Sequence, residues 1–271
     1  MPPKNNDRLV TWLGSIFQKR YEPNFAYVNA YSSIAGLPGL RAMWTMGAHS
    51  AAGGHLLDPT ANGAWLGNIN TVPLGYEGLA PVAILGGVND YFARADGGAN
   101  SWADCTGGET FINNAVRGMI VGGWFRLDRL TNLEGLIGKW AGVLAQNNYL
   151  LAFRGDLAND PIEFHCGNGG AVANATLNFS PVAGTWYFCW GRYDRTSGDI
   201  TVGVDNQTSV NAATGLGNLV DGTAPFNIGT YGSAIAYCLQ GRVSFCELCG
   251  MSLSDTIMKN AFHQTRALFG K

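Results

Sequence analysis

The sequence predicts an all-β fold, a sandwich or a barrel, and three observations support this class. Segments rich in branched and aromatic residues recur about every 8–12 residues, which is the spacing of short strands in such folds. Glycine, asparagine and aspartate separate these segments, and glycine alone contributes 38 of the 271 residues. Aromatic residues make up 11% of the chain, whereas disordered chains are poor in them.

The individual strands follow from apolar runs and from alternating large side chains. The run 186–190 places its bulkiest aromatic residues on one face, as a half-buried strand does. Apolar residues alternate over 200–204, and Asp205-Asn206 directly after them is a turn signal. The expected strands in this half of the chain are 117–126, 136–140, 149–153, 162–165, 186–190 and 200–204.

A helix is expected at each end of the chain. Near the start, apolar residues at helical spacing form one stripe of an amphipathic helix, namely Leu9, Trp12, Leu13, Ile16 and Phe17. Residues 21–38 follow as an extended arm, so that residues 1–38 form one segment and residues 39–271 form the sandwich. A short C-terminal helix is expected within 254–269, with Ile257, Ala261, Phe262 and Leu268 on its buried side.

Two interpretations of the N-terminal stripe stay open. In one, the stripe packs on the sandwich of its own chain. In the other, it is an assembly device that docks on a partner protein or on symmetry-related copies. A stripe that contains Trp12 and Phe17 is unfavourable in water, and the aromatic arm separates it from the main domain, which together favour assembly.

Charge and targeting signals restrict the function classes. Charged residues make up 13% of the chain, the net charge is −2 and the pI is about 6.1. No basic face is visible that could neutralise phosphates, which argues against nucleic-acid binding. The first residues lack the regions of a secretory signal, and no apolar run is long enough to span a membrane. We therefore expect either a signal that has been removed or release by cell lysis.

The six cysteines are expected to be buried or half-buried free thiols. Cys246 and Cys249 have the spacing of a redox motif or a zinc half-site, but their surroundings predict a strand, where residues three apart point to opposite faces. No second cysteine pair or histidine pair completes a zinc set.

Over residues 39–270 the sequence resembles the concanavalin A-like, laminin G-like domains. Five weak motifs occur in the order and spacing of that family: 39–46 with the loop 58–63, 82–91, 184–187 with 193–194 and 204–206, 226–229 with 241–243, and 253–255. The resemblance implies a two-sheet antiparallel jelly-roll sandwich. Its members include lectins, adhesins, toxins, phage fibres and virion surface proteins, so the fold alone does not choose a function.

Catalysis is not expected. Glycan hydrolases on this fold need two carboxylates on one strand, flanking the bond that breaks. No such acid run occurs, because Glu163 stands alone beside His165, and Asp194, Asp199 and Asp205 belong to turns. The nucleophile and zinc-protease motifs are also absent.

Two kinds of binding site are candidates. Many relatives hold one Ca²⁺, and this resemblance points to Asp58, Asn62 and Asp90, whose oxygens Ca²⁺ prefers. The other interpretation is that Asp58 and Asp90 only cap turns. Trp65 and Trp102 lie in loops rich in glycine and asparagine and are the preferred candidates for a glycan platform.

These observations lead to three functional hypotheses. The first is a non-catalytic virion surface subunit, such as a bacteriophage capsid-decoration or fibre protein, anchored by residues 1–38 and displaying a lectin-like domain. The second is a carbohydrate-binding module or adhesin of a cell, located outside or on the cell surface. The third is a glycan hydrolase, which needs an acid pair that the sequence does not contain.

Overall fold

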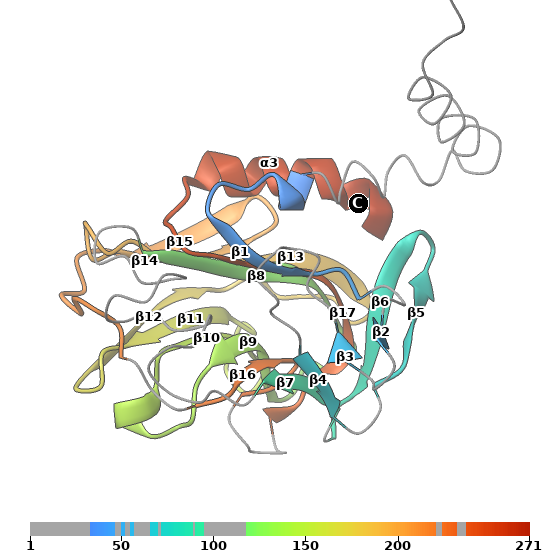
Figure 1. Cartoon of the computed structure of the whole chain (residues 1–271), viewed down its shortest axis with the longest axis horizontal. Helices are drawn as coiled ribbons and strands as arrows, with labels where there is room; N and C mark the ends of the chain where they lie inside the picture. Colours follow the sequence, from blue (N-terminus) through green and yellow to red (C-terminus); the bar gives the residue numbers. More distant parts are fainter. Residues whose placement is uncertain are drawn as a thin grey trace, which may run out of the picture.

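Two antiparallel sheets pack face to face, and a C-terminal helix covers the outside of one of them (Figure 1). The computed structural model describes residues 33–46, 50–51, 55–56, 66–69, 72–88, 90–94, 118–220, 224–231 and 237–271. In that part of the chain the predicted jelly-roll sandwich is confirmed. The N-terminal stripe of Leu9, Trp12, Leu13, Ile16 and Phe17 lies outside the described residues.

Within the described residues, sheet A has eight strands and sheet B has nine. Sheet A runs in the order β15 (Gln207–Asn211), β14 (Ile200–Val204), β13 (Thr185–Tyr193), β8 (Met119–Leu127), β17 (Gln240–Cys249), β6 (Ala80–Gly86) and β5 (Leu74–Glu77), with β1 (Leu40–Trp44) also paired to β17. Sheet B runs in the order β12 (Val172–Leu177), β11 (Ile162–Gly167), β10 (Tyr149–Arg154), β9 (Leu133–Lys139), β16 (Phe226–Ile228), β7 (Tyr91–Arg94), β4 (Leu66–Ile69), β3 (His55–Leu56) and β2 (Ser50–Ala51). The helices are η1 (Leu144–Gln146), α3 (Asp255–Thr265) and η3 (Arg266–Phe269).

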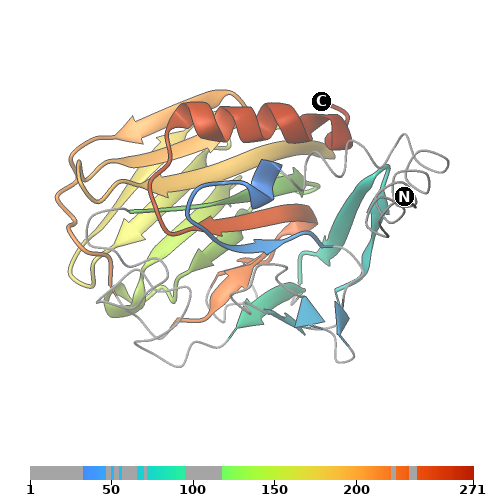
Figure 2. The ribbon, with the colours of Figure 1, turned by 45° about the horizontal axis from the view of Figure 1, so that its top comes forward.

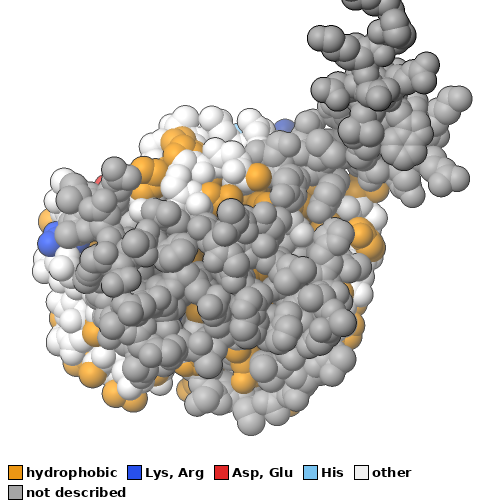
Figure 3. All heavy atoms as spheres, viewed as in Figure 1, with side chains coloured by type: hydrophobic (Ala, Val, Ile, Leu, Met, Phe, Trp, Pro, Cys, Tyr) orange, Lys and Arg blue, Asp and Glu red, His pale blue; other side chains and the backbone are white. Residues whose placement is uncertain are grey.

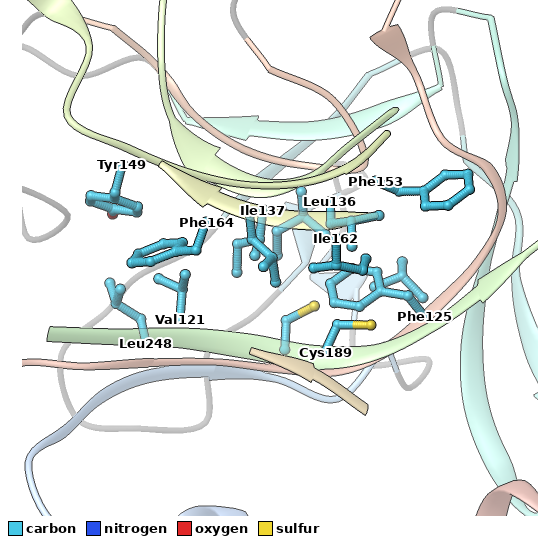
Figure 4. Close-up of a cluster of buried hydrophobic side chains, with 14 of the residues drawn as sticks. Val121, Phe125, Leu136, Ile137, Tyr149, Phe153, Ile162, Phe164, Cys189 and Leu248 are labelled. Carbon is cyan, nitrogen blue, oxygen red and sulfur yellow. The ribbon is translucent and has the colours of Figure 1, made fainter. Parts of the chain in front are cut away.

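The main core lies between the two sheets. Alternate residues of facing strands point inward, so Phe125 on β8 and Phe153 and Phe164 on sheet B are fully buried in one cluster (Figure 4). The six strands expected between 117 and 204 correspond to β8, β9, β10, β11, β13 and β14, with ends that agree within three residues. The Asp205-Asn206 turn joins β14 to β15, and Asp205 takes the left-handed backbone (φ 52°) that such a turn requires.

α3 lies over the outer face of sheet A (Figure 2), and a second apolar layer lies between them. Trp124 anchors it, because its Nε1 donates to Thr265 Oγ1 at 2.9 Å and its ring stacks on Phe269 with centroids 4.1 Å apart. Ser254 caps α3, its side chain accepting a hydrogen bond from the Ile257 backbone. The predicted C-terminal helix is confirmed, and of its four predicted buried residues only Ile257 is half-buried.

The described end of the expected arm differs from an extended chain. Residues 33–35 form a helical turn, and Ile34 and Leu37 are buried in the layer under α3. The reason is apolar burial, since these side chains complete the cover of sheet A. The division of the chain at residue 38 stays a prediction.

The five cysteines in the described part of the chain are buried and free, as the sequence predicts. Cys246 points into the core between the sheets, whereas Cys249 points into the layer under α3. Opposite faces exclude a CxxC site at these two residues. Burial also raises the pKa of the Cys166, Cys189 and Cys246 thiols, which keeps them protonated and unreactive. In the described helices, no segment is both long and apolar enough to cross a membrane.

Glu247 is a fully buried carboxyl group in the layer under α3. Its register neighbours are Gly122 and Met43, and neither of its oxygens has a hydrogen-bond partner among the described residues. Glycine at 122 makes room for it, because a Cβ there would lie 2.7 Å from Glu247 Oε1. Burial raises the pKa of Glu247 well above its usual value, so the group is held as the neutral acid.

Replacing Glu247 with glutamine is expected to remove a pH dependence from stability. A carboxyl with a raised folded-state pKa contributes its full stability below its unfolded pKa, about 4.5, and loses it as pH rises toward the folded value. Above pH 4.5, the free energy of unfolding of E247Q should therefore rise relative to that of the parent by up to about 1.4 kcal/mol per pH unit. Urea denaturation at several pH values between acid and mildly alkaline conditions measures this. Parallel curves for the two proteins would contradict the assignment.

Candidate binding face

The outer face of sheet B carries a polar cluster at β10, β11 and β12. Because side chains alternate along a strand, the residues between the inward-facing Ile162, Phe164 and Cys166 point outward. The strand register sets Glu163 opposite Thr176 and His165 opposite Asn174. We call the following residues the Glu163 cluster: Arg154, Asp156, Glu163, His165, Asn174 and Thr176.

Glu163 is the centre of this cluster. Its Oε2 accepts from Arg154 Nη1 at 2.9 Å and lies 3.0 Å from His165 Nε2. Its Oε1 accepts from Thr176 Oγ1 at 3.2 Å and from Asn174 Nδ2 at 3.5 Å. Three strands therefore hold one carboxylate, which fixes the positions of the polar groups around it.

Arg154 joins Glu163 to a second carboxylate. It forms a two-pronged pair with Asp156, with Nε–Oδ1 at 2.9 Å and Nη2–Oδ2 at 3.0 Å. Hydrogen bonding from His165, aided by the Arg154 charge, lowers the pKa of Glu163 to about 2 although burial opposes this shift. The hydrogen bond from Arg154 likewise lowers the pKa of Asp156. Both carboxyls are therefore ionised hydrogen-bond acceptors at neutral pH and are unsuited to donating a proton.

Aromatic rings lie on the same outer face. The Trp140 ring contacts the His165 ring, with centroids 5.7 Å apart, and packs with Leu150, Ala152 and Tyr231. Tyr231 stacks on Tyr237 at 4.5 Å with an interplanar angle of 10°. Trp140 is only 8% exposed, whereas the His165 side chain is 19% exposed and Thr176 is exposed. The accessible part of the face is thus mainly polar, beside the buried Trp140 ring and the half-buried rings of Tyr231 and Tyr237.

The site residues predicted from the sequence are mostly outside the described residues: Asp58, Asn62, Trp65 and Trp102. Asp90 is described, and its Oδ2 accepts from the Gly86 backbone N–H at 3.0 Å, so it caps the turn after β6. Among the described residues no three His, Cys, Asp or Glu side chains gather to hold a metal ion. The described residues alone do not fit Ca²⁺, which takes six to eight oxygens, and the calcium site stays a prediction.

The sequence alone does not predict the Glu163 cluster as a site, because Glu163 stands there as an isolated acid beside His165. A usable signal existed, because polar residues alternate at 163 and 165 and again at 174 and 176. Their meeting depends on the register of β11 with β12, which a single sequence does not specify.

No protein-family profile matches the sequence. No curated protein matches it. Solved structures do match the fold. The ligand-binding domain of botulinum neurotoxin serotype D, in complex with N-acetylneuraminic acid, is 11% identical with a TM-score of 0.62, over 86% of this chain and 52% of that one. The binding domain of Paraclostridial Mosquitocidal Protein 1 is 10% identical with a TM-score of 0.62, over 83% and 52% of the two chains.

A third match, the botulinum neurotoxin serotype G binding domain, is 10% identical with a TM-score of 0.60, over 83% of this chain and 50% of that one. The chain thus spans about half the length of these binding domains. At this level of identity the similarity shows the fold alone. The two-sheet sandwich predicted from the sequence is therefore a fold that this chain shares with solved binding domains.

Replacing Glu163 with glutamine is expected to destabilise the protein at neutral pH by roughly 1–3 kcal/mol, because the four donors around this buried side chain lose a charged acceptor. A carboxyl with a lowered folded-state pKa contributes stability above its unfolded pKa, and this is lost as pH falls from about 4.5 to about 2. The difference between E163Q and the parent should shrink over that interval in denaturation experiments. Asp156→Asn is the matched control, with a smaller expected effect because Asp156 is more exposed. A pH-independent difference would argue against the ionised carboxylate.

Proposed function

We propose that the chain is a non-catalytic recognition protein of a virion surface, and that its sandwich binds a glycan at the outer face of β10–β12. The observation that carries this proposal is the Glu163 cluster. Amide, hydroxyl, imidazole and carboxylate groups from three strands share one accessible sheet face beside the buried Trp140 ring. Sugars offer many hydroxyl groups that donate to carboxylates and accept from amides, so this composition suits a glycan.

The state of the acids supports binding without catalysis. A glycan hydrolase needs one carboxyl with a raised pKa that can protonate the leaving group. On the Glu163 cluster both acids have lowered pKa values. Burial raises the pKa of Glu134 to about 7 and also raises the pKa of Glu247, but both side chains are fully buried and no substrate reaches them.

The fold similarity suggests the ligand class to test first. One matched structure is a ligand-binding domain in complex with N-acetylneuraminic acid, and the others are binding domains of toxins. Recognition of a glycan on a cell surface is therefore a reasonable starting hypothesis for this sandwich.

The virion setting rests on the sequence. Charged residues are few, and the described part of the face in Figure 3 shows mostly white atoms, from other side chains and the backbone, and orange hydrophobic side chains. Such a surface suits a subunit that neighbours cover in part. The stripe of Leu9, Trp12, Leu13, Ile16 and Phe17 would anchor the chain to the particle. A cellular carbohydrate-binding module or adhesin is the second candidate, favoured by the same polar face.

A glycan array with the full chain tests the recognition face. We expect selective binding that His165→Ala and Asn174→Ala reduce at least about tenfold, because each removes a polar group of the face. Asn218→Ala, which replaces an exposed asparagine outside the cluster, is the matched control and should bind like the parent.

Two other outcomes of the array would count against the proposal. Loss of binding only in Trp65→Ala or Trp102→Ala would move the site to the loops and contradict the face on β10–β12. Binding of no glycan would contradict the recognition function itself. Release of new reducing ends from a bound glycan would support the hydrolase in its place.

The anchor is tested in the full chain by replacing Trp12 and Phe17 with serine. We expect this change to remove the chain from purified virus particles, because the apolar stripe loses its largest side chains, while the melting temperature stays near that of the parent. Ser15→Ala with Gln18→Ala, on the opposite side of the predicted helix, is the control. Particles that keep the W12S/F17S chain at the parent level would contradict the anchor.

A further inference from the structure

β15 is an edge strand without the features that usually protect edges. Among the described residues only β14 pairs with it, and no described group bonds to its outer side. Its sequence, Gln-Thr-Ser-Val-Asn, has no charge and no proline, and its register with β14 is regular. Natural edge strands are commonly blunted by lysine, proline or a bulge, so an open edge of this kind calls for a partner.

The hydrogen bonds of the neighbouring strands show which groups of β15 point outward. Asp205, the residue directly after β14, donates its backbone N–H to the Phe188 carbonyl on β13 at 2.8 Å. Backbone groups alternate in direction along a strand, so Thr201 and Gly203 of β14 also bond to β13, and the residues between them bond to β15. The residues of β14 directed to β15 are Ile200, Val202 and Val204, which pair with Asn211, Ser209 and Gln207. The backbone groups of Thr208 and Val210 are therefore the ones that face away from the sheet.

We propose that β15 is a homodimer interface, in which two copies pair antiparallel about a two-fold axis at Ser209. In this register Thr208 lies opposite Val210 of the partner subunit, and the two exchange both backbone hydrogen bonds. By symmetry, Val210 pairs in the same way with Thr208 of the partner subunit, so four backbone hydrogen bonds join the two sheets. An antiparallel pair about a two-fold axis is self-complementary, as an interface between identical subunits must be.

The side chains of β15 are compatible with pairing to the same strand of a second copy. Gln207 lies opposite Asn211 of the partner subunit, and amides both donate and accept. Val210 is 51% exposed and would pack against the partner's Thr208, a β-branched pair that sheets favour. The strand carries no charge, so two copies meet without repulsion, and the nearby Asp205 is neutralised by Lys271 at 2.6 Å.

The proposed interface is small, so we expect the two subunits to associate weakly. Two five-residue strands bury less than the roughly 1,200 Å² of standard stable complexes, so the dimer should dissociate reversibly on dilution. Sedimentation of the full chain over a dilution series measures this exchange.

A cysteine at the proposed axis tests the register directly. In an antiparallel pair the non-hydrogen-bonded partners have Cα atoms about 4.5 Å apart, within the range of a disulfide. Ser209→Cys should therefore form a covalent dimer under mild oxidation, seen by non-reducing electrophoresis. The parent, which has no cysteine on β15, should not form a dimer linked there. This result is specific to β15 even if residues 1–38 hold the chain in a larger assembly. Absence of the covalent dimer would overturn the proposal.

A lysine substitution on β15 provides a second test, measured as a change in dimerisation. Val210→Lys places two like charges beside the proposed axis and should weaken dimerisation at least about tenfold. Val182→Lys, at a loop residue that is 64% exposed, is the matched control and should behave like the parent. A parent that stays monomeric at high concentration, or a V210K chain that dimerises normally, would overturn the proposal.

Discussion

Burial of both faces of sheet A is the constraint on which the rest of the structure depends. Its central strands carry apolar residues inward, such as Phe125, and outward, such as Trp124 and Trp190. Exposing either face to water would be costly, so the inward face needs sheet B and the outward face needs α3 with residues 33–38. Within the described chain, polar groups can therefore gather on a sheet face mainly at the outside of sheet B. The candidate site lies there because the other large faces are occupied.

The same constraint separates the acids into two groups. Glu247 lies under α3, where no described group offers it a hydrogen bond, and burial holds it as the neutral acid. Glu163 lies on the opposite side of the sandwich, where four donors surround its carboxylate and hold it ionised. Both are fixed parts of the fold. Only the second lies where a ligand could reach its neighbours, so environment rather than residue type distinguishes a structural acid from a recognition site.

The sequence predicts the fold well and the candidate site poorly, for physical reasons that differ. Strand alternation and turn residues are local, so the six strands expected between 117 and 204, the Asp205-Asn206 turn and the C-terminal helix are correctly placed, whereas β12 (Val172–Leu177) was not predicted. The helical turn at 33–35 was missed because its cause is tertiary, the burial of Ile34 and Leu37 against sheet A. The Glu163 cluster was missed for a similar reason. Its members come from three strands, and they meet only in one strand register, which composition does not determine.

The two proposals meet at one contact between the sheets. Asn211 of β15 donates from Nδ2 to the carbonyl of Asn174 at 2.9 Å, and Asn174 belongs to the Glu163 cluster. An interface at β15 would therefore place a recognition site of each subunit directly beside the two-fold axis. Two weak sites on one rigid dimer bind a surface that carries many copies of a glycan far more tightly than either site alone, because the second contact becomes intramolecular. A shallow polar face with few exposed rings is expected to bind single sugars weakly, so dimerisation and recognition would support one function.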